Sequence, residues 1–240
     1  MHKRSLPKAG LLFALLLTLA GCAATRATPD YAAVLTNMAR PENERALDAV
    51  RKPNEVLAFY GVKKGDKVAD LLSGRGYYTA ILSELVGPEG IVYATSQREV
   101  MEWVDRFKRS FFGNVRTVVG APDKFALPQD GSLDFALTHL NYHDLSREVR
   151  AGMNKVVLAA LKNGGIYAVV DHSARQGSGD SDSKTLHRID KQLVIEEVTK
   201  AGFKLVSEGN MLSRHDDKRD FNVNKVRNQD DRFVLKFAKP

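Results

Sequence analysis

The stretch Val68-Ala69-Asp70-Leu71-Leu72-Ser73-Gly74-Arg75-Gly76-Tyr77-Tyr78-Thr79 decides the fold of this chain. A short apolar run ends just after Asp70, and a helical pattern begins at Tyr77. Between them, Gly74 and Gly76 allow the backbone to pass close to a ligand, while the start of the helix offers unpaired N–H groups. A strand, a glycine turn and a helix in this order, with an acid at the strand's end, predict a ligand-binding turn. The simpler alternative is that the glycines only permit a positive φ angle there.

Strand-like and helical patterns alternate on both sides of this stretch. Apolar runs predict strands at residues 67–72, 91–95, 115–119, 133–140, 166–171, 203–208 and 232–238. Helical patterns occupy residues 32–40, 42–51, 77–85, 97–111, 147–161 and 190–201. We expect Gly164 and Gly165 to end the fifth of these helices, and residues 176–183, rich in Gly, Ser and Asp, to form a mobile loop. The alternation predicts an α/β fold, a doubly wound, mostly parallel, Rossmann-like sheet of seven strands with helices on both faces.

Ligands in such sheets bind outside the carboxyl ends of the strands, where the strand order reverses. The fourth strand should lie beside the first and bring Asn141, Tyr142, His143 and Asp144 up to the glycine turn. A histidine there can act as a general base, because its pKa lies near neutrality. The structural alternative, equally open at this point, is that His143 only caps the chain after the strand and Asp144 orients it.

A metal site receives little support from the sequence. Nitrogen and oxygen ligands are offered near the strand ends by His143, Asp144, Asp171 and His172. They come from different loops, without a fixed helical pair such as His-x-x-x-His, so we predict that no metal is bound. His139 lies within an apolar strand and is expected to be structural, while Asp190, three residues after His187, is expected to be the N-cap of a helix.

Residues 68–79 resemble motif I of class I S-adenosylmethionine (SAM) methyltransferases, whose usual form is acid-x-Gly-x-Gly-x-Gly. Over about residues 40–240 the chain also resembles a family of predicted bacterial methyltransferases, often exported. The segments that carry this resemblance are Arg51-Lys52-Pro53, residues 70–79, Asn141-Tyr142-His143-Asp144, Asp171-His172-Ser173 and Leu186-His187-Arg188-Ile189-Asp190. The resemblance implies a methyltransferase-like domain over residues 31–240, SAM as methyl donor, and a small-molecule or cell-envelope substrate.

The resemblance also implies roles for individual residues. It implies that Asp70, Gly74 and Gly76 bind the amino-acid end of SAM. Ser96 would bind the ribose, Asp123 the adenine, and Asn141 would lie beside the methyl group. His143 and Asp144 would be the catalytic residues. Two positions depart from the motif. Leu72 stands at the first motif glycine, and Ser96, a weaker hydrogen-bond partner than a carboxylate, stands where an acid usually follows the second strand. These departures favour an alternative: an inactive or repurposed methyltransferase-like domain that binds another small ligand in the envelope.

Charge and the missing motifs exclude several classes of protein. The 240 residues suit one domain with an N-terminal appendage, and the formal net charge is +7. Residues 214–220 alternate in sign without interleaved aromatic residues, so we read them as a solvated face and expect no nucleic acid partner. The glycine turn lacks the third glycine and the ribose acid of an NAD site, and neither a serine nucleophile elbow nor a P-loop lysine occurs.

The N-terminus has the pattern of an export signal. Residues 1–8 are basic and residues 9–20 are apolar apart from Thr18, a run too short for the roughly 20 residues that span a bilayer. The segment Leu19-Ala20-Gly21-Cys22 resembles the bacterial lipobox. The resemblance implies a lipoprotein signal peptide over residues 1–21, a lipidated Cys22, a tether over residues 22–30, and a periplasm-facing protein on the outer membrane, because Ala23 follows the cysteine. An ordinary signal peptide with a chance cysteine is the alternative.

The lipid anchor makes the first testable prediction. Cys22 is the only cysteine of the chain, so Cys22→Ser removes the only residue that a lipobox could modify. Acyl chains on one residue supply more than one membrane signal, which stable anchoring requires. We therefore expect the variant to move from the membrane fraction to the soluble fraction of lysed cells. Fractionation equal to that of the wild type would contradict the lipobox prediction.

Overall fold

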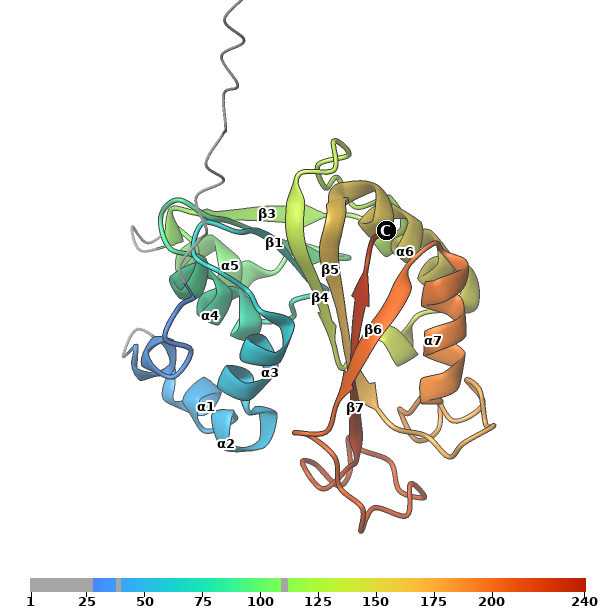
Figure 1. Cartoon of the computed structure of the whole chain (residues 1–240). Coiled ribbons are helices and arrows are strands. Elements are labelled where there is room, and N and C mark those ends of the chain that lie inside the picture. The colour runs from blue at the N-terminus through green and yellow to red at the C-terminus, as the bar shows by residue number, and fades with distance from the viewer. Residues whose placement is uncertain (1–27, 38–39, 109–111) are drawn as a thin grey trace, which may run out of the picture.

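A seven-stranded sheet lies at the centre of the computed structural model, which describes residues 28–37, 40–108 and 112–240 (Figure 1). Its strands are β1 (Lys67–Leu71), β2 (Ile91–Ser96), β3 (Val115–Val119), β4 (Leu133–His139), β5 (Leu161–His172), β6 (Lys204–Gly209) and β7 (Arg232–Ala238). They follow the order β3-β2-β1-β4-β5-β7-β6. The first five strands pair in parallel, and β7 runs antiparallel to both β5 and β6. The predicted seven-stranded, mostly parallel sheet is confirmed.

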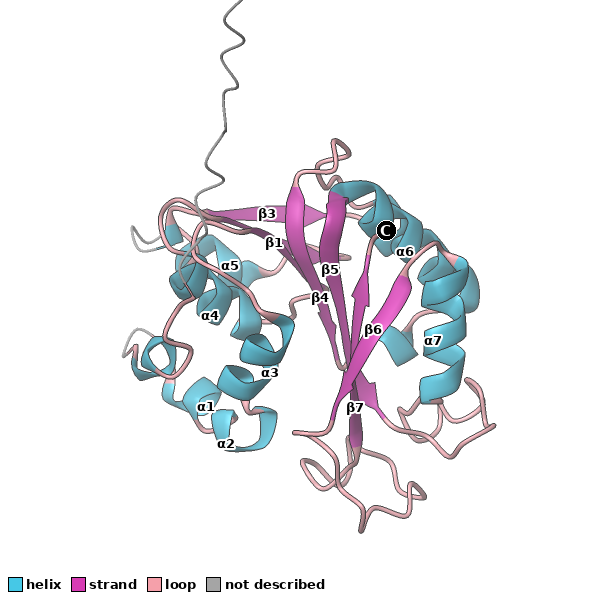
Figure 2. Cartoon of the chain, viewed as in Figure 1, coloured by secondary structure: helices cyan, strands magenta, loops and turns pink. Residues whose placement is uncertain are grey.

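Helices cover both faces of this sheet (Figure 2). They are α1 (Glu42–Arg45), α2 (Asp48–Arg51), α3 (Pro53–Tyr60), α4 (Tyr77–Val86), α5 (Met101–Arg106), α6 (Arg147–Ala160) and α7 (Lys191–Lys200), with short 3-10 turns at Ala33–Thr36, Pro122–Lys124 and Tyr142–Asp144. In the described ranges, none of the helices is long and apolar enough to cross a bilayer. Successive side chains of a strand face opposite sides of the sheet. Val68 accordingly packs in the core under α3, α4 and α5, whereas Ala69 and Leu71 pack in the core under α6 and α7.

Several element boundaries differ from those expected. Helix α6 ends at Ala160, and Gly164 and Gly165 lie inside β5, because Leu161 already pairs with Leu133 of β4. Helix α5 begins only at Met101, since Val100 before it is still extended. Helix α3, which the sequence patterns did not reveal, begins with Pro53, a residue that suits the first position of a helix.

Residues 176–183, expected to be mobile, have defined hydrogen-bond partners. The side chain of Arg150, almost fully buried, donates to Asp180 at 2.8 Å. Asp190 caps α7, as predicted, by accepting a hydrogen bond from the backbone of Gln192. The other oxygen of the Asp190 carboxylate accepts from the backbone N–H of Gly177 at 2.6 Å. These bonds tie the segment to α6 and to the start of α7.

The turn after β1 contains three residues in the left-handed region of backbone conformation. Their φ angles are +55° at Leu72, +56° at Gly74 and +87° at Gly76. A Cβ atom at Gly76 would lie 2.7 Å from Cζ of Phe107, whereas a Cβ at Gly74 would meet nothing within 4 Å. The two glycines therefore serve different purposes. Gly76 permits the close approach of the α5 segment, whereas Gly74 supplies the backbone conformation and has open space beside it.

This difference predicts unequal effects of alanine at the two positions. Gly74→Ala introduces left-handed strain alone and should lower the free energy of unfolding by about 1–2 kcal/mol. Gly76→Ala adds a steric clash with Phe107 and should lower it by about 2–4 kcal/mol. Urea denaturation of both variants measures the difference. Equal losses would contradict the packing role of Gly76.

Candidate active site

The strand order reverses between β1 and β4, and a side chain bridges the two strands there. The amide Nδ2 of Asn141, just after β4, donates to the carbonyl oxygens of Leu71 at 3.3 Å and Leu72 at 3.1 Å. The amide oxygen of Asn141 accepts from the hydroxyl of Thr138. The predicted approach of the residues after β4 to the glycine turn is therefore present. Ligands bind at such a reversal in open α/β sheets.

Two threonines brace this turn, and neither stood out in the sequence. Thr95 is the buried penultimate residue of β2, and its hydroxyl accepts a hydrogen bond from the backbone N–H of Leu72 at 2.9 Å. Its carbonyl oxygen accepts the backbone N–H of Ser73 at 2.9 Å. Thr79, in the first turn of α4, donates its hydroxyl to the Asp70 carboxylate at 2.6 Å. The strained backbone at Leu72 is thus held by Thr95 of β2 as well as by Asn141 after β4.

Helix α5 and the N-terminal helices close over the other side of the turn. The indole of Trp103 donates to the carbonyl oxygen of Gly74 at 3.1 Å. Arg106 donates to the carbonyl oxygen of Arg75 and also pairs with Glu44 of α1 at 2.6 Å. The guanidinium of Arg51, at the end of α2, lies 4.4 Å from the ring centroid of Tyr77. The helices before β1 are therefore part of the frame around the glycine turn.

The Asp70 carboxylate lies in an unusual electrostatic environment. Burial raises its pKa to about 7, although the hydrogen bond from Thr79 and the charge of Arg51 act in the opposite direction.

Two further polar atoms, Tyr78 Oη and His139 Nε2, are buried without a hydrogen-bond partner among the described residues, and the centroids of their rings lie 4.6 Å apart. Burial, together with the positive charge of Arg51, keeps the pKa of His139 well below its usual value. This region therefore has unused hydrogen-bonding capacity.

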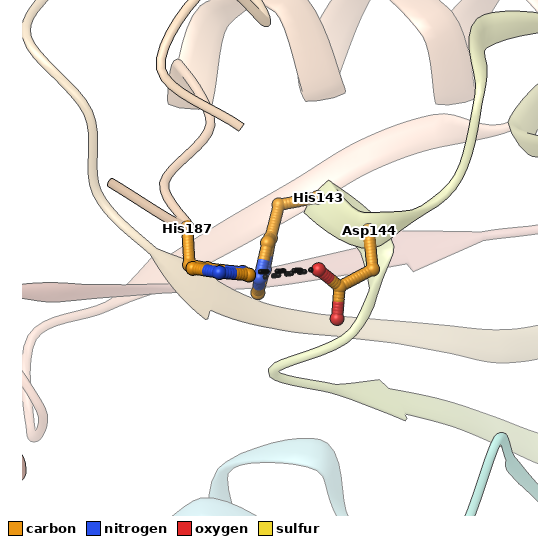
Figure 3. A group of neighbouring side chains, drawn as sticks. All are labelled: His143, Asp144 and His187. Atoms are coloured by element: carbon orange, nitrogen blue, oxygen red, sulfur yellow. Dashed lines mark hydrogen bonds and ion pairs between the residues drawn. The ribbon is translucent and has the colours of Figure 1, made fainter. Parts of the chain in front are cut away.

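A second polar cluster lies beyond the carboxyl ends of β4 and β5. Nδ1 of His143 lies 2.7 Å from a carboxylate oxygen of the fully buried Asp171, and the backbone N–H of His143 donates to the other oxygen. Nε2 of His143 faces Oδ1 of Asp144 at 3.2 Å, and Nδ1 of His187 faces the same oxygen at 3.2 Å (Figure 3). His187 was missed as a site residue, because the sequence places it 43 residues from Asp144.

The two carboxylates determine the protonation of His143. Burial lowers the pKa of His143, but Asp171 and Asp144 outweigh that effect and raise the pKa to about 10. At neutral pH the ring therefore holds its proton and forms an imidazolium between two carboxylates, which is not the proton-accepting form of a general base. Catalytic roles for His143 and Asp144 stay predictions.

The remaining predicted residues lie in different places. Ser96 ends β2 next to Thr95, so it is at the correct edge of the sheet. Asp123 instead packs closely against Gly152 of α6. The approach is so close that a Cβ atom added at Gly152 would lie 2.4 Å from Cβ of Asp123. His172 adjoins the second cluster, with its ring centroid 5.4 Å from that of His143, and its Nδ1 pairs with the buried Asp230. Ser96 thus shares the sheet edge with the turn, and His172 contacts the cluster.

Comparisons with known sequences find methyltransferases over part of the chain. No protein-family model matches. The chain is 33% identical over 121 residues to the demethylmenaquinone methyltransferase of Staphylococcus aureus (strain Newman), a match that covers 49% of this chain and 48% of that protein. It is 40% identical over 65 residues to the protein-L-isoaspartate O-methyltransferase of Ignicoccus hospitalis, covering 26% of this chain and 31% of the relative. The chain therefore spans about a third to a half of the length of these relatives.

Solved structures match over most of the chain. A SAM-dependent methyltransferase from Aquifex aeolicus has a TM-score of 0.62 and 19% identity, covering 88% of this chain and 99% of the other. The [4+2]-cyclase SpnF has a TM-score of 0.64 and 15% identity, covering 85% and 86%. An arsenic(III) SAM methyltransferase from Chlamydomonas reinhardtii has a TM-score of 0.57 and 16% identity, covering 88% and 73%. The chain has the fold of SAM-dependent methyltransferases.

Proposed function

We propose that this protein is a SAM-dependent methyltransferase acting on a small-molecule or cell-envelope substrate. The observation that carries the proposal is the position of the glycine turn. It follows β1 at the reversal of strand order, with Asp70 at the end of the strand and Asn141 bridging to β4. Ligands bind at this place in open α/β sheets, and the partial sequence matches to methyltransferases point to the same chemistry.

The side chains around the turn fit the amino-acid end of SAM. Asp70 is a buried carboxylate whose pKa is raised by burial, and the SAM ammonium group would supply a second positive charge beside that of Arg51. The unpaired atoms of Tyr78 and His139 add hydrogen-bonding capacity nearby. Asp70, Gly74 and Asn141 would hold the cofactor, which supplies the methyl group.

The departure at Leu72 is compatible with this fit. Leu72 adopts φ = +55°, in the left-handed region that a glycine would favour, so the turn keeps that conformation without the first motif glycine. The strain costs roughly 1–2 kcal/mol. A hydrogen bond from the Leu72 N–H to Thr95 and one from Asn141 to the Leu72 carbonyl oxygen hold this conformation. Ser96 remains in position to bind the ribose hydroxyls, whereas the packing of Asp123 against Gly152 weighs against an adenine contact.

In this proposal the substrate binds beside the second cluster, which lies beyond the carboxyl ends of β4 and β5. Methyl transfer needs chiefly an in-line placement of the nucleophile and the methyl group. The Asp144 side chain is 54% exposed, so it can accept a hydrogen bond from a substrate hydroxyl or amine. His143, held by Asp171, would keep that carboxylate oriented. In this proposal Asp144 contacts the nucleophile and His143 positions Asp144.

The rival function is a methyltransferase-like domain that binds another small ligand in the cell envelope. Ser96 in place of an acid favours it, and SpnF shows that this fold also occurs in a protein named for cyclisation. The proposed envelope location favours it as well, since SAM is made in the cytoplasm. That location, lipid-anchored and periplasm-facing at the outer membrane, depends on residues 1–27, which lie outside the described residues, and stays part of the proposal.

Titration calorimetry of the full chain in mild detergent tests the cofactor. We expect S-adenosylhomocysteine and SAM to bind, and Asp70→Ala to weaken binding at least tenfold, a loss of about 1.4 kcal/mol or more. Asp144→Asn should leave SAM affinity unchanged, because Asp144 faces the substrate side. His215→Ala, at an exposed histidine elsewhere, is the matched control. Absence of binding at millimolar SAM would exclude the methyltransferase and favour the rival function.

The raised pKa of Asp70 predicts a specific dependence of stability on pH. The folded-state pKa of about 7 exceeds the unfolded value of 3.8, so between these values the folded state binds the proton more tightly. The free energy of unfolding should therefore fall as the pH rises from about 4 to 7, by roughly 4 kcal/mol from this group. Asp70→Asn, which can still accept the Thr79 hydrogen bond, should lack this fall. Urea denaturation across that range measures both profiles, and parallel profiles would contradict the prediction.

A further inference from the structure

The second cluster brings three metal-binding side chains together from distant parts of the sequence. His143 and Asp144 come from the 3-10 turn after β4, and His187 comes from the segment between β5 and α7 (Figure 3). Each offers one ligand atom, and these atoms all lie within 4.8 Å of one another. Oδ1 of Asp144 is 3.2 Å from a ring nitrogen of each histidine. Ligand atoms about 2.1 Å from a tetrahedral ion lie roughly 3.4 Å apart, so the two separations of 3.2 Å from Asp144 fit a shared ion.

A buried carboxylate behind the cluster orients the first ligand. Asp171 is fully buried and engages both Nδ1 and the backbone N–H of His143. This contact turns Nε2 toward Asp144. Histidines that bind metals commonly donate their other ring N–H to such a carboxylate, which fixes the ring and strengthens the ligand. The support that a metal ligand requires is therefore built into the end of β5.

The backbone at His187 is held in a strained conformation. Its φ is +55°, a left-handed value that a residue with a Cβ rarely adopts. The next residue, Arg188, is completely buried and donates to the carbonyl oxygen of Ser173 and to Asp217, each at 2.8 Å. These bonds fix the chain on the C-terminal side of His187. Strain that the surroundings maintain in this way is typical of functional sites.

Exposure and ligand type define the ion that the cluster suits. The side chain of His143 is buried, while those of Asp144 and His187 are 54% and 31% exposed. One side of the cluster is therefore open to water or to a ligand atom, as in metal sites with three protein ligands. Two imidazoles and one carboxylate suit divalent transition metals, whereas Mg²⁺ and Ca²⁺ prefer oxygen ligands.

We propose that His143, Asp144 and His187 form a binding site for a divalent transition-metal ion such as Zn²⁺, with at least one coordination position open. The metal takes the place of the hydrogen bonds that now join the two histidines to Asp144. This differs from the sequence-based expectation of no metal, which considered His172 in the set and not His187. The site shares His143 and Asp144 with the substrate side of the proposed function but does not include Asp70, so metal binding can be measured without SAM.

Metal titration of the full chain in mild detergent, freed of metal with a chelator, tests the proposal. Co²⁺ is the probe, followed by its visible absorption, and Zn²⁺ is then added in competition. We expect one equivalent to bind to the wild type with micromolar affinity or better. His187→Ala and Asp144→Asn alter partly exposed side chains and should each weaken binding at least tenfold, whereas His215→Ala should not.

The orienting role of Asp171 gives a second arm. Loss of a carboxylate behind a metal-bound histidine lowers metal affinity about 10–100-fold, so Asp171→Asn should weaken Co²⁺ binding by that factor. Circular dichroism and thermal unfolding verify that each variant is folded. No binding by the wild type at millimolar Co²⁺ would overturn the proposal. Binding that survives both His187→Ala and Asp144→Asn would also overturn it, because the ion would then lie elsewhere on the chain.

Discussion

The bridge from Asn141 to the turn after β1 is the interaction on which the candidate site depends. Its amide donates to the carbonyl oxygens of Leu71 and Leu72, while Thr138 of β4 holds its oxygen. One side chain thereby determines both the shape of the turn and the starting point of the residues that follow β4. Asp70 precedes the turn that this bridge holds, and the cluster begins at His143, two residues after Asn141. The parallel pairing of β1 with β4 makes such a bridge possible.

Asp70 and the cluster differ in their electrostatic balance. Asp70 is a buried carboxylate with a raised pKa, a condition that a positively charged ligand would relieve. In the cluster, by contrast, the carboxylates of Asp171 and Asp144 already have a positive partner, the imidazolium of His143 between them. A cationic cofactor therefore suits the first region. A metal ion in the second would have to displace protons that the carboxylates now stabilise.

Local patterns were sufficient to predict the sheet and the glycine turn, but not the cluster. Each strand is an apolar run with turn residues at its ends, and that information is contained within a few residues. His187 meets Asp144 from a distant segment, which the buried Arg188 anchors through Ser173 and Asp217. Gly164 was read as the end of a helix, although pairing with β4 and β7 places it within β5. Long-range pairing and burial decided both cases, and neither is visible in a local pattern.

Leu72 illustrates why a motif should be read as backbone geometry as well as a set of residue types. A leucine at the first motif glycine breaks the pattern only if residue names alone are compared. Its φ of +55° shows that the chain keeps a left-handed conformation there, with the strain held by Thr95 and Asn141. Ser96 departs from the motif in a different way. The usual residue there is a carboxylate, and no backbone conformation can give a serine hydroxyl the charge of a carboxylate. The choice between a methyltransferase and a binder of another ligand therefore depends on the chemistry at the end of β2, since the turn after β1 is compatible with both.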